Sequence, residues 1–227
     1  MRGIIFDMDG VLIDAMPFHA EAMKIAIKEE TNYEIDKKIV YQLEGMPSNN
    51  LVKEIFKKYN INKELDQELI EKISERKKQI FKEIEDTHLI EGVPDLIKML
   101  NECKCLKAIV TGAAKKEIEL TIDKMIGLKN FDVVVSGEDV EAGKPNSDPF
   151  VVALQKMNIK SSECIVVENA PLGVEAANKA GIRCILTLNN TPLDISTDFN
   201  NIISKETQIF RDTKSTTDFL RKWCCNN

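Results

Sequence analysis

The sequence lacks the features that define several large classes of protein. No apolar stretch approaches the ~18 residues of a membrane-spanning helix, and no small-residue cleavage site follows the short apolar run after Arg2. The net charge of −6 leaves no basic excess for nucleic acid. No apolar heptad seam is left over for a coiled-coil partner. We therefore expect a cytoplasmic monomer without a nucleic-acid or membrane partner.

Cysteine is present, but not in a spacing typical of metal or redox sites. Of the six cysteines, Cys103 and Cys105 are one residue apart, and Cys224 and Cys225 are adjacent. Neither pair has the two intervening residues of common zinc or dithiol motifs. Because disulfides are rare in the cytosol, we expect all six to be reduced thiols.

Apolar runs alternate with helical patterns over much of the chain. Four runs are predicted to be buried strands and a fifth is a candidate: Gly3–Phe6, Leu106–Val110, Val133–Val135, Cys164–Val167 and Arg183–Leu188. Helices are predicted between most of them, at Pro94–Leu100, Lys115–Ile126, Pro149–Met157 and Pro171–Ala180. This alternation predicts an α/β fold, with a parallel sheet covered by helices on both faces.

A region of different character interrupts this pattern after the first strand. Residues 15–90 contain helical periods and no convincing strand, including a helix that Ser48 is placed to cap and a long charged helix over Lys63–Asp86. We therefore predict a core domain of residues 1–14 and 91–227 and an all-helical cap domain of residues 15–90. An insertion at the carboxyl end of a strand would cover a site there.

The first strand ends in the motif Asp7-Met8-Asp9-Gly10. Residues i and i+2 of a strand point the same way, so the two carboxylates repel unless a cation lies between them or one is protonated. Mg²⁺ takes such oxygen ligands, and the acids would then serve as nucleophile and as general acid and base. A capped turn is the alternative, because Asp-x-Asp-Gly is also turn chemistry.

Three further polar motifs follow predicted strands. Thr111 and Gly112 precede a helix and are suited to hold a phosphate, or only to cap that helix. Lys144, between glycine and proline, would neutralise carboxylates and a phosphoryl group, or be an ordinary loop lysine. Glu168 and Asn169 offer oxygen ligands for a cation, or form an exposed loop pair. Their common placement at strand ends favours one site.

With these motifs the chain resembles the haloacid dehalogenase-like superfamily, in its branch of β-phosphoglucomutases and phosphatases with a helical cap. The motifs are the DxDGVLxD opening and the KPxxDPF and VENAPLGVEAAxKAG stretches, and the resemblance covers the chain from Ile4 to about Leu188. It implies a Rossmann-like parallel sheet with helices on both faces, plus an all-helical cap inserted after the first strand.

The resemblance also implies a role for each residue of the motifs. Asp7 would take the phosphoryl group as an aspartyl phosphate, and Asp9 would protonate the leaving oxygen and then activate water. Thr111 and Gly112 would bind the phosphoryl oxygens, and Lys144 would bridge phosphate and Asp7. Mg²⁺ would be held by Asp7, Asp9 (through its backbone carbonyl), Glu168 and Asn169. Because an alkoxide leaving group needs a proton donor, Asp9 favours phosphate esters over carbon–halogen bonds.

Two positions depart from the family pattern. Asn169 stands where the family usually has Asp, which removes one negative charge; Glu168 alone, or the nearby Glu138 or Asp139, would then compensate. In the cap, Ser48 follows Gly45 where β-phosphoglucomutases have an Arg that grips a second phosphate. A serine hydroxyl cannot make that bidentate, charged contact.

The cap departure favours a phosphatase over a mutase. We predict a Mg²⁺-dependent phosphatase of a small phosphorylated metabolite, such as a sugar phosphate or phosphoglycolate. The alternative, a β-phosphoglucomutase-like mutase, is supported by His19 and Lys77, which match the family's cap histidine and lysine. Each also has a plainer interpretation, as a packing histidine and a solvated charge. The predicted substrate-binding residues are Thr111, Gly112, His19, Gly45, Ser48 and Lys77.

Overall fold

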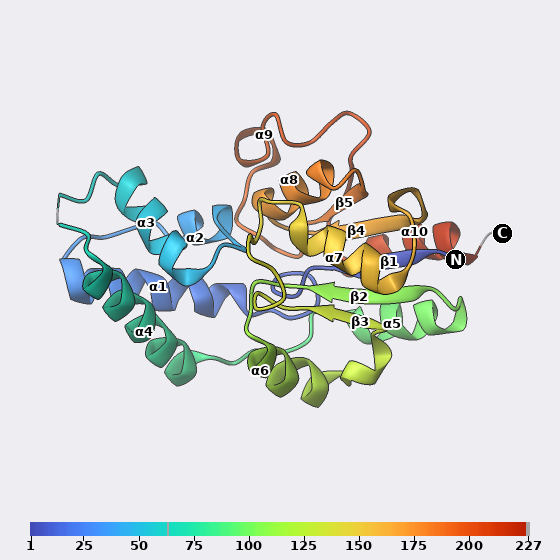
Figure 1. The fold of residues 1–227 in the computed structure, drawn as a ribbon, viewed down its shortest axis with the longest axis horizontal. Coiled ribbons are helices and arrows are strands. Elements are labelled where there is room, and N and C mark those ends of the chain that lie inside the picture. The colour runs from blue at the N-terminus through green and yellow to red at the C-terminus, as the bar shows by residue number, and fades with distance from the viewer. Residues whose placement is uncertain (63, 226–227) are drawn as a thin grey trace.

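The computed structural model describes residues 1–62 and 64–225. They form a six-stranded parallel sheet flanked by helices, with a separate group of helices beyond one end of it (Figure 1). The strand order is β3-β2-β1-β4-β5-β6. The strands are β1 (Gly3–Phe6), β2 (Leu106–Val110), β3 (Val133–Val135), β4 (Cys164–Glu168), β5 (Arg183–Thr187) and β6 (Gln208–Phe210). This confirms the predicted fold class.

The α-helices also follow the predicted order, with one change of type. Their bounds are α1 (Met16–Thr31), α2 (Lys38–Gln42), α3 (Ser48–Lys58), α4 (Gln67–Ile84), α5 (Val93–Glu102), α6 (Lys115–Ile118), α7 (Asp148–Met157), α8 (Pro171–Lys179), α9 (Ile195–Asp198) and α10 (Thr213–Cys225). The predicted helix Lys115–Ile126 begins as an α-helix over Lys115–Ile118, continues as a π-helix over Glu119–Asp123 and ends in two further α-helical residues.

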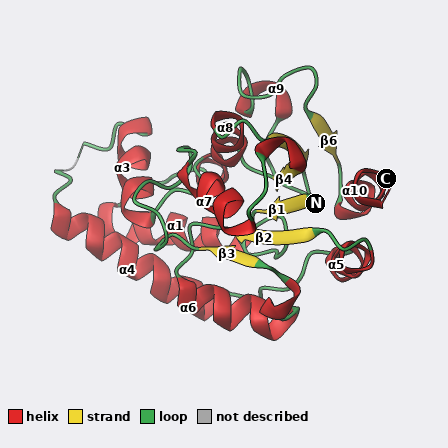
Figure 2. Ribbon diagram, turned by 45° about the vertical axis from the view of Figure 1, so that its right-hand side comes forward, coloured by secondary structure: helices red, strands yellow, loops and turns green. Residues whose placement is uncertain are grey.

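Helices cover both faces of the sheet (Figure 2), and successive residues of β1 pack on opposite faces. On one face Ile4 and Phe6 of β1 pack in a core with residues of α5 and α10, such as Leu96 and Leu220. On the other face Ile5 packs with residues of α7 and α8. Because both faces are buried, the strands are continuous apolar runs, which is why they were predictable.

Helices α1 to α4 bury a core of their own. It includes Met23 and Ile27 of α1, Ile55 of α3 and Ile73 of α4, all fully buried. The chain enters this group after Ile13 and leaves it at Leu89, and these two residues form an antiparallel bridge. The entry and exit segments therefore lie side by side, at the boundary with the sheet.

Several local predictions were wrong or lie outside the described residues. Ser48 does not cap α3 but is its first residue, preceded by Pro47. The long charged helix begins at Gln67 rather than near residue 63, which lies outside the described residues. The strand β6 was not predicted, because it is short and lies at the sheet edge with no fully buried residue.

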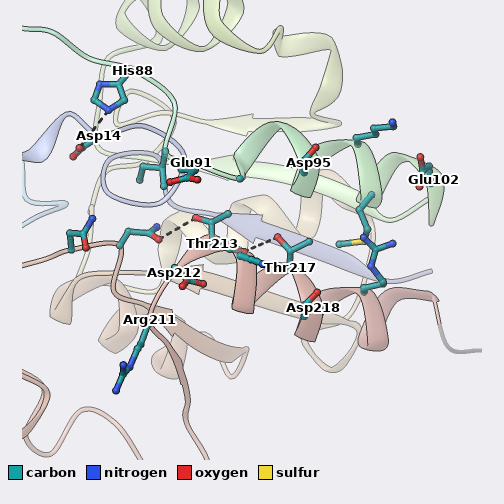
Figure 3. A pocket seen from close by; sticks show the side chains of 18 residues that line it. Asp14, His88, Glu91, Asp95, Glu102, Arg211, Asp212, Thr213, Thr217 and Asp218 are labelled. Atoms are coloured by element: carbon teal, nitrogen blue, oxygen red, sulfur yellow. Dashed lines mark hydrogen bonds and ion pairs between the residues drawn. The ribbon is translucent and has the colours of Figure 1, made fainter.

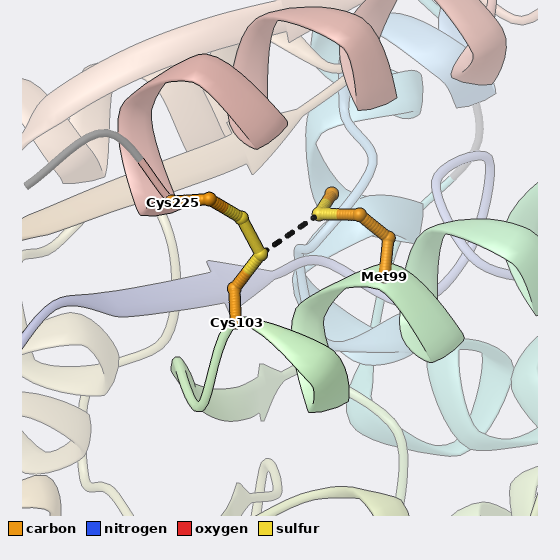
Figure 4. Close-up of a disulfide and its surroundings, with 3 residues drawn as sticks. All are labelled: Met99, Cys103 and Cys225. Carbon is orange, nitrogen blue, oxygen red and sulfur yellow. Dashed lines mark hydrogen bonds between the residues drawn. A yellow bond between two sulfur atoms is a disulfide. The ribbon is translucent and has the colours of Figure 1, made fainter.

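The prediction of six reduced thiols is wrong for one pair. Cys103, after α5, forms a disulfide with Cys225, at the end of α10 (Figure 4). The two helices pack against one face of the sheet and contact each other, which brings together cysteines 122 residues apart. Local spacing along the sequence carries no information about such a pair. Within residues 1–62 and 64–225, no helix is both long and apolar enough to cross a bilayer.

Candidate active site

The candidate residues meet because their strands are paired in register. Phe6 of β1 lies opposite Ile109 of β2 and Val167 of β4. The next residues along these strands therefore emerge at the same edge of the sheet. Asp7, Thr111 and Glu168 are all buried there, at 5%, 6% and 1% relative exposure.

Lys144 lies at the centre of this group. Its ammonium donates to Asp7 Oδ1, to Glu168 Oε1 at 2.5 Å and to the carbonyl oxygen of Val110 at 3.3 Å. Lys144 lies in the loop before α7, and its side chain is buried at this edge of the sheet, with a relative exposure of 3%. A buried ammonium between two carboxylates satisfies charges that would otherwise be costly to bury.

The same contacts shift the ionisation of the buried groups. Burial raises the pKa of Asp7 well above its usual value; Lys144 opposes this, and the charges of Glu168 and Asp9 add to it. Burial alone would lower the pKa of Lys144, but the adjacent carboxylates of Asp7 and Glu168 outweigh it and raise that pKa. The two neighbouring carboxylates therefore favour the protonated form of Lys144.

Asp9 is approached from the helical group by His19, which is in turn contacted by Lys77. Lys77 Nζ lies 2.7 Å from His19 Nδ1. An ammonium can only donate, so Nδ1 accepts and the ring proton is on Nε2, which lies 3.7 Å from Asp9 Oδ1. Burial, aided by Lys77, lowers the pKa of His19, and burial lowers the pKa of Lys77. His19 also stacks on Phe81, with ring centroids 4.1 Å apart.

A cavity of about 180 Å³ opens beside Lys144 and Thr111. Thr111 Oγ1 accepts the N–H of Ala113 at 3.1 Å, which fixes the hydroxyl at the cavity wall. Gly112 and Gly45 face each other here, because a Cβ on Gly112 would lie 3.1 Å from the Gly45 oxygen. Ser48 is not among the residues that line this cavity, so of the predicted cap residues only Gly45 lines it.

Glu168 is held from two sides. Its Oε2 accepts the backbone N–H of Asn169 at 3.0 Å and of Ala170 at 3.3 Å. On the other side lies Gly173 of α8, where a Cβ would come within 1.8 Å of Oε1. The need for a residue without a Cβ at position 173 was not predicted, although a glycine in the first turn of a predicted helix indicates close packing.

Asn169 has a partner that the sequence did not indicate. Its Nδ2 donates to both carboxylate oxygens of Glu44, at 3.1 and 3.0 Å. Glu44 precedes Gly45 in the helical group and is buried, and burial, together with the charges of Asp7 and Glu168, raises its pKa well above the usual value. Asp139, a predicted substitute for the missing charge, is instead bound to Ser136 and Lys156.

A larger hollow of about 910 Å³ lies elsewhere, between α5 and α10 (Figure 3). Both acidic and basic side chains line it, among them Asp95, Arg211 and Asp218. Volume alone would favour this cavity. We place the site at the smaller one, because Lys144 and Thr111 line it and the Lys144 ammonium joins it to the buried carboxylates of Asp7 and Glu168.

The donor set near Asp7 fits Mg²⁺. In the part of the chain that the structure describes, no three carboxylate, imidazole or thiol side chains form a metal site by themselves. Amide or backbone oxygens must therefore contribute. Besides Asp9 Oδ1, two buried oxygens of the site, Asp7 Oδ2 and Asn169 Oδ1, have no hydrogen-bond partner among the described residues. Both are of the hard type that Mg²⁺ prefers.

The chain belongs to the haloacid dehalogenase-like hydrolases, whose family model matches residues 4–187. An uncharacterised Haemophilus influenzae protein is 32% identical, over 80% of this chain and 88% of that protein. A Thermotoga maritima phosphatase of phosphorylated carbohydrates is 28% identical, over 82% of this chain and 84% of that protein. The chain is thus a phosphoric monoester hydrolase by family and relatives.

Solved structures share the fold over the whole chain. A putative beta-phosphoglucomutase from Bacteroides vulgatus is 24% identical and superposes with a TM-score of 0.84. The alignment covers 100% of this chain and 91% of that one, so the helical group and the sheet have counterparts there. This confirms the predicted fold, a parallel sheet with a helical group inserted after the first strand.

Proposed function

We propose that the protein is a Mg²⁺-dependent phosphatase that hydrolyses a small phosphorylated metabolite through an aspartyl phosphate on Asp7. One observation carries the proposal: Asp7 is fixed by Lys144 through Oδ1, while its Oδ2 has no partner among the described residues. A carboxylate anchored by one oxygen and free at the other is suited to attack phosphorus.

The neighbouring residues supply the rest of the reaction. Asp7 attacks the phosphorus, and Asp9 gives its proton to the departing ester oxygen. Asp9 then takes a proton from the water that cleaves the aspartyl phosphate, releasing phosphate and restoring both acids. Lys144, the Thr111 hydroxyl and the Gly112 N–H offset charge on the phosphoryl oxygens. Mg²⁺, held by Asp7, the Asp9 carbonyl, Glu168 and Asn169, would add positive charge at the same oxygens.

The size of the site and the relatives support a small substrate. The cavity beside Lys144 measures about 180 Å³, and Gly45 closes one side of it. The Thermotoga maritima relative is a phosphatase of phosphorylated carbohydrates. We infer a sugar phosphate or a phosphoglycolate-like ester as the substrate class.

Released phosphate from a panel of phosphorylated metabolites, measured with Mg²⁺ and with a chelator, tests the proposal. We expect turnover with Mg²⁺, its loss with the chelator, and its loss in Asp7→Asn. Asp95→Asn, the same change at an exposed residue of α5 outside the site, is the matched control and should retain activity. Full activity of Asp7→Asn would refute the mechanism.

A mutase is the second candidate, supported by the contact of Lys77 with His19 and by the approach of His19 to Asp9. A mutase must release the aspartyl phosphate to a second substrate hydroxyl rather than to water. Conversion of β-glucose 1-phosphate to the 6-phosphate, faster than phosphate release, would establish it. Ser48 lacks the charge to hold a second phosphate, which favours hydrolysis.

We also propose the predicted division of the chain, with residues 1–14 and 91–227 as the core domain and 15–90 as the cap domain. The separate apolar core of α1 to α4 and the paired linkers at Ile13 and Leu89 support it. The monomeric state and the cytoplasmic location stay predictions, and the Cys103–Cys225 disulfide is unusual for that compartment.

A further inference from the structure

We propose that Glu44, a residue of the cap, completes the cation site of the core by supplying the negative charge that Asn169 lacks and by fixing the orientation of the Asn169 amide. The inference rests on the proposed function, since it concerns the same Mg²⁺ site. It gives a cap residue a role in the cation site, whereas the motifs at the strand ends contain core residues only.

The contacts fix which atom of the amide faces which way. Both oxygens of Glu44 lie within 3.1 Å of Asn169 Nδ2. With Nδ2 on this side, both Glu44 oxygens accept from it, whereas a flipped amide would face the ionised Glu44 with its oxygen. Gly10 confines the amide further, because a Cβ there would lie 2.2 Å from Nδ2. The amide oxygen is left as a free acceptor.

The site is built rather than accidental. Glu44 is 9% exposed and Asn169 is 2% exposed, so neither contact is a surface encounter. Asn169 Oδ1 and Asp7 Oδ2 are buried without a partner in the described part of the chain. Burying an acceptor without a donor costs free energy. A cation that binds both oxygens would remove that cost.

The chemistry of the pair explains why an amide is tolerated at position 169. One acid and one amide share a hydrogen bond across the boundary between cap and core. Two facing acids would repel each other, and two amides would leave the site one charge short. The site needs one carboxylate at the two positions, and in this chain the carboxylate is on the cap side.

The experiment measures Mg²⁺ binding by isothermal titration calorimetry of the metal-free protein with MgCl₂ alone. Glu44→Gln keeps the shape and a hydrogen bond to Asn169 but removes the charge. The double variant Glu44→Gln/Asn169→Asp moves the charge from cap to core and reverses the hydrogen bond. Glu34→Gln is the matched control, because it removes a cap carboxylate whose side chain is 74% exposed.

We expect Glu44→Gln to weaken Mg²⁺ binding by about tenfold, as changes next to metal ligands commonly do. The double variant should return to within about threefold of the original protein, and Glu34→Gln should bind normally. Unchanged binding in Glu44→Gln, or weak binding that the double variant does not restore, would overturn the inference.

The binding experiment separates this inference from the proposed function. If the unaltered protein binds Mg²⁺ and releases phosphate while Glu44→Gln binds equally well, only the role of Glu44 is wrong. If the unaltered protein binds no Mg²⁺, both proposals fail together. Because binding is measured without substrate, an unsuitable choice of ester cannot produce either result.

Discussion

The core places its site residues at the ends of paired strands, whereas the cap places its residues on helices packed against each other. Asp7 and Glu168 are fixed by strand register, and Lys144 locks them together. Glu44, His19 and Lys77 reach the site only because the helical group lies against the sheet edge. The core half is therefore preorganised, while the cap half depends on how the two groups meet.

This difference divides the expected effects of substitutions. A change that moves a buried core group should damage both folding and turnover, because the same contacts serve both. A change in a cap contact should damage turnover and leave folding nearly intact. A change on the surface of the core should lower stability slightly and leave turnover nearly intact. Three substitutions test this division, in decreasing order of expected effect.

Gly173→Ala should have the largest effect. In an ordinary helix this change is favourable, but here the new Cβ would lie 1.8 Å from Glu168 Oε1. Displacing Glu168 disturbs its contacts with Lys144 and two backbone N–H groups. We expect activity to fall by about 10- to 100-fold and the free energy of unfolding by about 2 kcal/mol. Urea unfolding and phosphate release measure the two; normal values for both would contradict the close packing.

His19→Gln should slow turnover without unfolding the protein. It removes the ring that Lys77 orients toward Asp9 and that stacks on Phe81. We expect about a tenfold lower kcat, or ~1.4 kcal/mol in the barrier, with a loss of stability below about 1 kcal/mol. His88→Gln is the matched control, since His88 is the other histidine and is 65% exposed. Equal kcat values for the two variants would show that His19 has no role in turnover.

Asp139→Asn should have the smallest effect, on stability alone. Hydrogen bonds from Ser136, with help from Lys156, hold the pKa of Asp139 below its usual value. A lowered pKa in the folded state contributes stability above the unfolded pKa of about 3.9 and loses it as pH falls below that value. We expect a loss of about 1 kcal/mol at pH 7, shrinking below about pH 4. Urea titrations at both pH values check this; a gap that widens in acid would contradict it.

The sequence predicted the core half of the site well, for a physical reason. Buried parallel strands are short apolar runs, and their polar successors meet at one edge. Asp7, Thr111 and Glu168 follow directly from that rule. The position of Lys144 needed the family pattern, because a loop lysine has no periodicity that reveals its direction.

The cap half was less predictable. Glu44 ends a short helical stretch and resembles a surface acid until the tertiary structure places it against Asn169. Ser48 was expected in the site but does not line its cavity. The Cys103–Cys225 disulfide was missed because its cysteines are 122 residues apart, and the strand β6 was missed because it is short and lies at the sheet edge.

The bridge between Ile13 and Leu89 holds the two ends of the helical group side by side, so the group could be exchanged as one segment. Because its two ends leave the core at neighbouring points, the span between them is set by one strand spacing and not by the length or fold of what is inserted. Another helical segment with ends equally close could be grafted there without moving Asp7 or Lys144. Evolution and protein engineering could thus change the selectivity of such an enzyme by replacing one continuous stretch of sequence.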